Sequence, residues 1–583
     1  MKKNYILYLF TVLFALTMGN SQIKAQTPNG NGVIYVTASG AGNKSGNSWT
    51  NASDDLQMAI NAANVQQVWV AGGTYKPKYR ADNMSAANAN DRNNAFVLKN
   101  NVQVYGGFAG TETLLGDRDL NNTANATTLS GDFNGDDAGF TNNGENAYHV
   151  VVSSGNNNSA MLNGFTLSGA NASSSADILI NGNQVYQCSG GGIYLSASSP
   201  VLQNLMITRN TVSESGGGIF GYESSPVLSG ITMQGNQAKD GGGMANQSQS
   251  SPVLSNIIIT ENEASELGGG LYNVTSSSPV LTNVSIGANT ANSGGGIYNA
   301  DASSKPQIRN SIIYGNNTGI EGNGTPVVSY SLVQGSTDIT NGNIDGNTNP
   351  DFVDASNGDY SLKNTSPLIN KGSNTYFDAG QTPDLNAITT DLAGNTRIIG
   401  TAIDLGAYEY QTPLPVTLIN FIAKADGNRT KLIWQTAAET NNALFVVYRS
   451  SNGTDFIAID QKAGLGTSAT GGNYLLYDSS PLNGTSYYKL VQVDNDGKET
   501  DLGIRSLNFS LSAFSPQLYP NPTKDKIYLD TDANDTYTLL NSVGQKLRTG
   551  NATALRNGLD VSELPAGLYL ITIAQKTYKF LKR

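Results

Sequence analysis

Charged side chains recur at one position of a repeated segment, where they could carry out acid–base chemistry. Glu214, Lys239 and Glu266 each lie two residues before a Gly-Gly-Gly triplet, and Asp240 follows Lys239. If the triplets stack, these side chains form an acid–base–acid column. A polysaccharide lyase needs such a base beside its substrate, and a glycoside hydrolase needs two carboxylates. An exposed salt-bridge ladder, worth less than about 1 kcal/mol per pair, is the favoured interpretation because no second basic residue converges there.

Aromatic side chains follow the same triplets and could contact a ligand. The second residue after each triplet is Tyr194, Phe220, Ala245, Tyr272 or Tyr298. If the residue before each of these points into a core, the rings point outwards, because side chains alternate along a strand. An outward column of rings could stack on sugar rings. One alternative is that the rings stack only on each other and stiffen the sheet. Another is that the rings, not the residues before them, point into the core.

A third group of residues offers oxygen ligands. Asp132, Asn134 and Asp136 occupy alternate positions, as in a calcium-binding loop, but the distal Glu of an EF-hand is missing, which favours an Asx-rich turn. Apart from this calcium option, no cofactor is expected. The single His149 is interpreted as a strand residue. The single Cys188 excludes an intrachain disulfide and a cysteine zinc site.

The elements that position these side chains follow from an internal repeat. Glycine triplets, prolines and asparagines each recur at intervals of 25 to 27 residues. The triplets begin at Gly190, Gly216, Gly241, Gly268 and Gly294; the prolines are Pro200, Pro226, Pro252, Pro279 and Pro306; the asparagines are Asn210, Asn236, Asn262, Asn289 and Asn316. A fixed period of this length indicates stacked repeats. The units contain short alternating runs rather than amphipathic helices, so each is predicted to be one coil of a parallel β-helix.

Stacking gives the repeated residues a physical role. Successive coils lie about 4.8 Å apart, so residues one period apart lie above each other. The asparagines can then pass amide hydrogen bonds from coil to coil. The first glycine of a triplet can adopt a positive φ at a corner, and each proline can begin a strand where its missing N–H does least harm.

The chain is predicted to be all-β, with four parts. Residues 1–25 resemble a signal peptide, with Lys2 and Lys3 before the apolar run Tyr5–Met18. That run is too short to span a membrane, and no later segment is apolar enough to do so. Residues 26–410 are predicted to form a right-handed parallel β-helix. Residues 411–510, after a linker at 413–415, are predicted to form a β-sandwich, and 511–583 a small third unit.

A short helix is expected near the start of the β-helix. Ser53–Ala63 carries an apolar stripe at helical spacing, with Ser53 as the expected N-cap. A β-helix needs covers because bare sheet edges pair with other chains. The helix is therefore expected to cover the first coils, just before a strand at Val68–Val70.

Charge limits the classes of partner. The formal net charge is −11, and residues 1–25 contain three lysines and no acid, so the remainder is more acidic still. Polyanions such as nucleic acids and anionic membranes are therefore disfavoured as partners. No transmembrane segment is expected in the mature chain.

Several segments resemble known families. Gly46-Asn47-Ser48-Trp49, Val68–Tyr75 and the GGGIY repeats resemble right-handed β-helices of the pectin-lyase-like superfamily and polymorphic outer-membrane-protein-like passengers. The stretches Asp391–Asn395 and Asp404–Glu409 resemble the close of such helices in bacterial surface proteins. Residues 413–510 resemble a fibronectin-III-like module.

The C-terminus resembles a sorting signal. Tyr519-Pro520-Asn521-Pro522, Leu564–Tyr569 and the basic end Lys576–Arg583 resemble the type A sorting domain of the type IX secretion system. This resemblance implies handling by the type IX machinery, export through both membranes, removal of the domain, and attachment to the cell surface or release. None of the resemblances carries a catalytic motif onto this chain.

The expected function is a non-enzymatic binding or adhesion protein at the cell surface, with a polysaccharide or matrix partner. A polysaccharide lyase or glycoside hydrolase on the same fold is the alternative, because one architecture hosts both. A structural surface-layer component that associates with itself is a third possibility.

Overall fold

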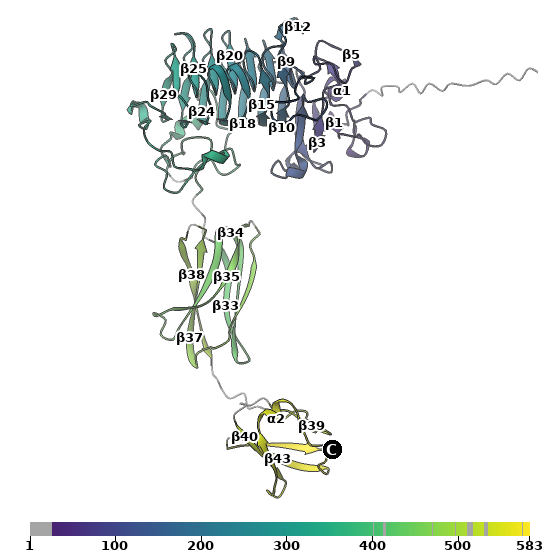
Figure 1. Cartoon of the computed structure of the whole chain (residues 1–583), viewed down its shortest axis with the longest axis vertical. Coiled ribbons are helices and arrows are strands. Elements are labelled where there is room, and N and C mark those ends of the chain that lie inside the picture. Colours follow the sequence, from purple (N-terminus) through teal and green to yellow (C-terminus); the bar gives the residue numbers. More distant parts are fainter. Residues whose placement is uncertain are drawn as a thin grey trace, which may run out of the picture. The chain divides into compact units, whose positions relative to one another are not determined.

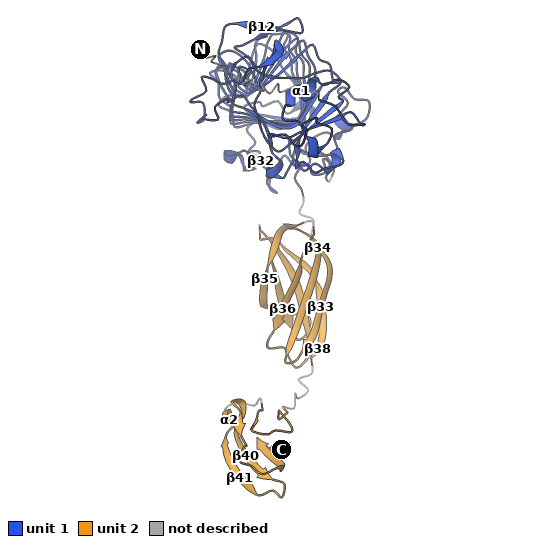
Figure 2. Cartoon of the chain, turned by 90° about the vertical axis from the view of Figure 1, so that its right-hand side faces the viewer, with its two compact units in different colours: residues 1–412 blue, residues 413–583 orange. Residues whose placement is uncertain are grey.

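The computed structural model describes residues 26–399, 401–411, 416–468, 470–495, 497–509, 517–529, 535–573 and 575–583. The expected signal peptide and linker lie outside these residues. The chain divides into two compact units, Met1–Thr412 and Pro413–Arg583, which Figure 2 colours blue and orange.

Unit 1 is a stack of coils whose strands form three parallel sheets. The long sheet has the path β1 (Val33–Val36), β2 (Gln67–Ala71), β7 (Gln103–Phe108), β10 (Met161–Ser168), β15 (Val201–Thr208), β18 (Val227–Gln234), β21 (Val253–Thr260), β24 (Val280–Gly287), β26 (Gln307–Arg309) and β29 (Val327–Ser329). Its side branches are β3 (Gly73–Tyr75), β8 (Thr127–Ser130), β27 (Ile312–Ile313) and β30 (Leu332–Val333).

The other two sheets complete the coils. The eight-stranded sheet contains β6 (Phe96–Val97), β9 (Val151–Ser154), β14 (Ile193–Ser196), β17 (Ile219–Tyr222), β20 (Met244–Gln247), β23 (Leu271–Asn273), β25 (Ile297–Asn299) and β28 (Ile320–Gly322). The short sheet contains β11 (Asn171–Ala172), β16 (Thr211–Val212), β19 (Gln237–Asp240) and β22 (Glu263–Leu267). In Figure 1, strands β9, β20 and β25 lie along one side of the stack and β15, β18 and β24 along another.

Register follows the sequence repeat. Ile207 pairs with Met233, Met233 with Ile259, and Ile259 with Ile286, so each coil advances by one period. These four side chains are buried in one core that continues along the whole stack. The predicted all-β fold, with a parallel β-helix ahead of sandwich-like antiparallel sheets, is confirmed.

The glycine triplets allow the coils to approach closely. Gly216 has φ of 73°, the left-handed region that favours glycine. A Cβ on Gly218 would lie 2.5 Å from the carbonyl oxygen of Gly243 on the next coil. The triplet is therefore required both by the corner and by the spacing between coils.

The expected N-terminal helix is shorter than predicted and has a different cap. Helix α1 spans Leu56–Asn61, and its N-cap is Asp55, whose carboxylate accepts from the N–H of Met58 at 3.0 Å. Ser53 instead accepts from the N–H of Asp55. Because the carboxylate of Asp55 accepts the unpaired N–H of the first helical turn, the helix begins after Asp55 and not after Ser53.

Helix α1 also closes one open edge. Strand β6 is the last strand of the eight-stranded sheet. The buried amide of Gln57 accepts from the N–H of Val97 at 2.7 Å and donates to the carbonyl of Val97 at 3.1 Å. A side chain thus occupies both hydrogen-bonding positions that another strand would use.

Hairpins and irregular segments cover the outside of the stack. The hairpins are β4 (Tyr79–Arg80) with β5 (Asn83–Ala87), β12 (Asp177–Ile180) with β13 (Asn183–Tyr186), and β31 (Phe352–Asp354) with β32 (Asp359–Leu362). Near the end of unit 1, Ala407 and Tyr360 pack on Ile258 of the long sheet. Asn283 donates to the carbonyls of Asp404 and Gly406, which fastens this segment to the coils.

Unit 2 contains two sets of antiparallel sheets, each with its own core. The first is β33 (Thr417–Asp426), β34 (Arg429–Ser450), β35 (Ile457–Ser468), β36 (Asn473–Asp478), β37 (Gly484–Asp494) and β38 (Glu499–Phe509), packed around Trp434. The second is β39 (Lys526–Ile527), β40 (Thr536–Asn541), β41 (Lys546–Asn551), α2 (Thr553–Arg556), β42 (Leu559–Asp560), β43 (Gly567–Ile573) and β44 (Lys576–Lys582). Among the residues described, no helix is long and apolar enough to cross a membrane.

Candidate functional site

The aromatic column lies on the outer face of the eight-stranded sheet. Tyr194 pairs with Phe220, Phe220 with Ala245, Ala245 with Tyr272, and Tyr272 with Tyr298, so the five residues stack in register. The residues just before them are fully buried in the core of the coils. The rings therefore point away from that core.

Two of the rings proposed for ligand contact are not accessible, which corrects the expectation for half of the column. Tyr194 is 0% and Phe220 2% exposed. Hairpin β12–β13 covers them, with Ile180 and Val185 in the same apolar cluster. This hairpin is an insertion without repeat periodicity, so the repeat pattern gave no sign of it.

Tyr272 and Tyr298 remain half-buried beyond the hairpin and form a stacked pair. Their ring centroids are 6.2 Å apart and their planes differ by 17°. Burial, followed by the charge of Asp240, raises the pKa of Tyr272 to about 12. Its phenol is therefore neutral at physiological pH and can donate a hydrogen bond. We call these two side chains the tyrosine pair.

The charged column forms a surface salt bridge rather than a base poised for catalysis. The Nζ of Lys239 lies 3.4 Å from Oε2 of Glu214, and both side chains are exposed. The charge of Glu214 raises the pKa of Lys239, so its ammonium stays protonated at neutral pH. A lyase base must be deprotonated to accept a proton, and Lys239 does not meet this requirement.

Asp240, which follows Lys239, has a raised pKa and a buried, unpartnered oxygen. Burial, and then the charge of Glu266, raises the pKa of Asp240 to about 6. Its Oδ1 atom is buried and has no hydrogen-bond partner. After burial, the charges of Asp240 and Glu266 are among the causes that raise the pKa of Tyr272.

The asparagine column runs through the inside of a corner. The Nδ2 of Asn210 donates to Oδ1 of Asn236 at 3.1 Å, and the same bond continues through Asn262 and Asn289 to Asn316 at 2.9–3.0 Å. Each Oδ1 also accepts the backbone N–H of the preceding asparagine. All of these amides are buried, so the column holds the coils together and offers no binding surface.

A second amide ladder was missed at the sequence level. Asn246 lies above Asn273, and Asn273 above Asn299, with Nδ2-to-Oδ1 distances of 2.9 and 3.0 Å. These residues are fully buried on the inner face of the eight-stranded sheet. Their signal was present, because each follows its triplet by three residues.

The expected calcium residues lie in an excursion that leaves the coil after Gly131. Asp132 accepts from the N–H groups of Gly135 and Asp137, the Asx-rich turn that was favoured. Asn134 is exposed and does not belong to the acidic group. The structure instead brings Asp137 and Glu145 beside Asp132 and Asp136.

The electrostatics of this acidic group are unfavourable in the absence of a cation. Burial raises the pKa of Asp137, and the charges of Asp132, Glu145 and Asp136 raise it further. We call Asp132, Asp136, Asp137 and Glu145 the acidic cluster. Sequence spacing could not predict that Glu145 belongs to this cluster, because it lies eight residues after Asp137 and outside any ligand motif.

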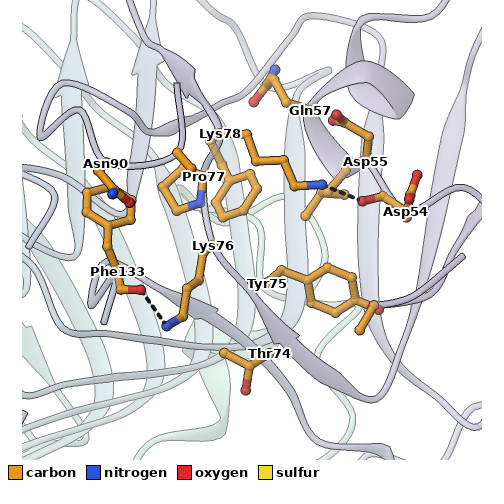
Figure 3. A pocket seen from close by; sticks show the side chains of 14 residues that line it. Asp54, Asp55, Gln57, Thr74, Tyr75, Lys76, Pro77, Lys78, Asn90 and Phe133 are labelled. Atoms are coloured by element: carbon orange, nitrogen blue, oxygen red, sulfur yellow. Dashed lines mark hydrogen bonds between the residues drawn. The ribbon is translucent and has the colours of Figure 1, made fainter. Parts of the chain in front are cut away.

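A cavity of about 320 Å³ lies between helix α1 and this excursion (Figure 3). Tyr75, Phe96 and Phe133 supply apolar walls. The lysines at its rim are held by backbone carbonyls: Lys76 donates to Phe133 at 3.0 Å and Lys78 to Asp54 at 2.9 Å, the two dashed lines in Figure 3. This cavity is large enough for a small ligand.

His149 lies two residues before strand β9, not within a strand as the sequence predicted. Its Nδ1 lies 2.9 Å from the carbonyl oxygen of Gly190, and the side chain is buried. Burial lowers its pKa to about 4, so the imidazole is neutral at physiological pH.

The fold defines an all-β protein with a parallel β-helix followed by antiparallel sheets. Residues 517–583 match the family described as the secretion system C-terminal sorting domain. The chain is therefore a type IX-secreted protein, handled by that secretion machinery and exported across both membranes to the cell surface or the extracellular space.

Other comparisons add little. No curated protein sequence matches this chain. Among solved structures, dimeric latent PorU from Porphyromonas gingivalis is similar over 31% of this chain and 22% of its own length, at 10% identity. The TM-score is 0.13, so this similarity carries no argument about fold or function.

Proposed function

We propose that the β-helix is a non-enzymatic binding domain that presents the tyrosine pair to a polysaccharide at the cell surface. The observation that carries this proposal is the stacked, partly exposed pair Tyr272 and Tyr298 on adjacent coils. Two nearly parallel rings on adjacent coils, each with a hydroxyl, offer apolar surface and hydrogen-bonding groups to a sugar ring, whose C–H face packs well on aromatic rings. The surrounding carboxylates favour a neutral polymer over an acidic one.

The residues beside the pair support a binding role. The side chains of Asp240 and Glu266 lie close enough to Tyr272 to raise its pKa. Carboxylates accept hydrogen bonds from sugar hydroxyls, while the rings contact C–H faces. The type IX sorting domain supports this role because it delivers the protein to the surface where polysaccharides lie.

The test is affinity electrophoresis of the full chain in gels that contain a neutral β-glucan or polygalacturonate. Tyr272→Ala with Tyr298→Ala should lose at least tenfold in affinity for the neutral polymer, because the apolar strip is removed. Tyr477→Ala, which removes a half-buried tyrosine from unit 2, is the matched control and should bind as the wild type does. Equal retardation of all three proteins would rule out the tyrosine pair as the contact.

A glycoside hydrolase is the second candidate, and Asp240 is the observation that favours it. A carboxyl with a pKa of about 6 can protonate a leaving group near neutral pH. Release of reducing ends from the same neutral polymers, lost in Asp240→Asn, would support this candidate. Polymer of unchanged length would leave binding as the function.

A further inference from the structure

We infer that the acidic cluster, together with Asn146, is a binding site for a divalent cation, and that the cation is calcium. The cluster lies in the excursion 132–146, which sequence spacing alone interpreted as an Asx-rich turn. The site differs from that expectation in its ligands, because Asn134 is replaced by Asp137 and Glu145.

The geometry fits a single ion. One carboxylate oxygen from each of the four acids lies within 4.8 Å of those of the others. Calcium–oxygen bonds are about 2.3–2.6 Å long, so ligands on opposite sides of one ion are separated by about 4.6–5.2 Å. Separations within this limit are compatible with one ion placed among the four oxygens, with small side-chain adjustments bringing each oxygen to bonding distance.

Unpartnered buried oxygens are an independent indication of a ligand. Oδ1 of Asp137, Oε1 of Glu145 and Oδ1 of Asn146 are each buried without a hydrogen-bond partner. Asn146 is 0% exposed, and its side-chain amide contacts the cluster, because Nδ2 donates to Oδ2 of Asp137 at 2.8 Å, which holds the unpartnered Oδ1 of the same amide next to the acids. Buried acceptors almost always have a partner, and a cation would supply one to all three.

Among the described residues, no lysine or arginine forms an ion pair with the acidic cluster, and the nearby guanidinium of Arg92 donates to the backbone carbonyl of Asn146. Lys76 lies near the turn, but its ammonium donates to the carbonyl of Phe133, and in the described part of the chain it makes no ion pair with these acids. The ends of the excursion are fastened, since the N–H of Ala147 donates to the carbonyl of Gly131 at 2.9 Å. The ligands therefore lie on a loop whose two ends are hydrogen-bonded together, so binding an ion does not require a long segment to become ordered.

The ligand chemistry favours calcium over magnesium. Four carboxylates and an amide oxygen are hard donors, and a loop that supplies so many of them suits the larger coordination number of calcium. Calcium sites in extracellular modules bind with dissociation constants of about 0.1–1 mM. The ion would also fix Phe133, which follows Asp132 and forms one wall of the cavity in Figure 3.

The experiment is calorimetric titration of calcium chloride into the EDTA-treated full chain, with thermal melting in EDTA and in 10 mM calcium. The wild type should bind one ion and melt several degrees higher with calcium. Asp137→Asn and Glu145→Gln should lose at least tenfold in affinity. Asn134→Ala, in the same loop but outside the cluster, is the matched control and should bind like the wild type.

Melting in EDTA separates lost binding from lost folding. Without metal, Asp137→Asn should melt at or above the wild-type temperature, because it removes one of four mutually repelling charges. Absence of binding heat and of a melting shift in the wild type would overturn the inference. So would affinities of the two cluster variants within twofold of the wild type, or binding of magnesium in preference to calcium.

Discussion

His149 illustrates how burial sets the behaviour of a single residue in this chain. Its ring packs edge-on against Tyr194, with centroids 5.2 Å apart, under the aromatic column. Neither Nε2 of His149 nor the hydroxyl of Tyr194 has a hydrogen-bond partner. Burial therefore lowers the pKa of His149 to about 4, although the carbonyl of Gly190 accepts at Nδ1, because Nε2 has no acceptor in the folded chain.

This lowered pKa predicts acid sensitivity. The pKa of histidine in the unfolded chain is about 6.5, so between pH 6.5 and 4 the unfolded state binds a proton that the folded state does not. Above pH 6.5, His149 causes no loss in the free energy of unfolding. As the pH drops from 6.5 towards 4, this free energy should fall by up to about 3 kcal/mol. His149→Gln, which stays neutral, should show a shallower dependence of Tm on pH over this window. Parallel curves for the two proteins would contradict the assignment.

Elements inserted between the repeats decide which parts of the repeat are accessible. Tyr194 and Tyr272 occupy equivalent positions, yet one is buried and the other half-exposed. The difference is hairpin β12–β13, whose ends are joined by a hydrogen bond from the N–H of Ser174 to the carbonyl of Gln187. The hairpin between Ser174 and Gln187 can therefore be deleted without separating the two ends of the coil that carries it.

Replacing residues 175–186 by two glycines should uncover the aromatic column. Tyr194 and Phe220 would each expose much of a side chain that buries about 150–250 Å². We expect a lower Tm and increased binding of a hydrophobic dye. If the tyrosine pair binds polysaccharide, affinity should rise, because the strip of rings lengthens. Unchanged dye binding would show that something else covers the rings.

The coils were predictable from sequence because every repeated residue has a neighbour one period away. The asparagine column, the glycine corners and the proline positions all follow from that one period. The excursion that carries Glu145, the cap at Asp55 and the covering hairpin have no periodic signal. The covering hairpin is positioned by contacts with other coils, such as the bond from Ser154 to the carbonyl of Ile180, which local patterns do not encode. The cap at Asp55 is local, but sequence alone does not choose between Ser53 and Asp55 as the cap.

At the scale of the whole molecule, destination is set by the last part of the chain. Residues 517–583 carry the sorting domain, whose own core includes Leu539, Ile571 and Phe580. The β-helix has a separate core in unit 1. The β-helix, with the surface proposed to bind polysaccharide, and the export signal are therefore carried by parts with separate cores that can be altered independently.

Removal of residues 517–583 should stop surface delivery without unfolding the β-helix. In a host with a type IX system, the truncated chain should be retained inside the outer membrane. Protease added to intact cells would measure this, since a retained chain is protected. The Tyr272→Ala chain is the control and should reach the surface. Surface exposure of the truncated chain would contradict the role of the domain.

The contact between Gln57 and Val97 has a consequence for how copies of the molecule associate with one another. A stack of identical coils is a template, and an open end could recruit the end of another copy and grow into a filament. At β6 the two hydrogen-bonding positions that a newcomer would need are already taken by the amide of Gln57. The eight-stranded sheet thus ends at β6 on a side chain of the same molecule, so its edge is not free to pair with another copy at Val97.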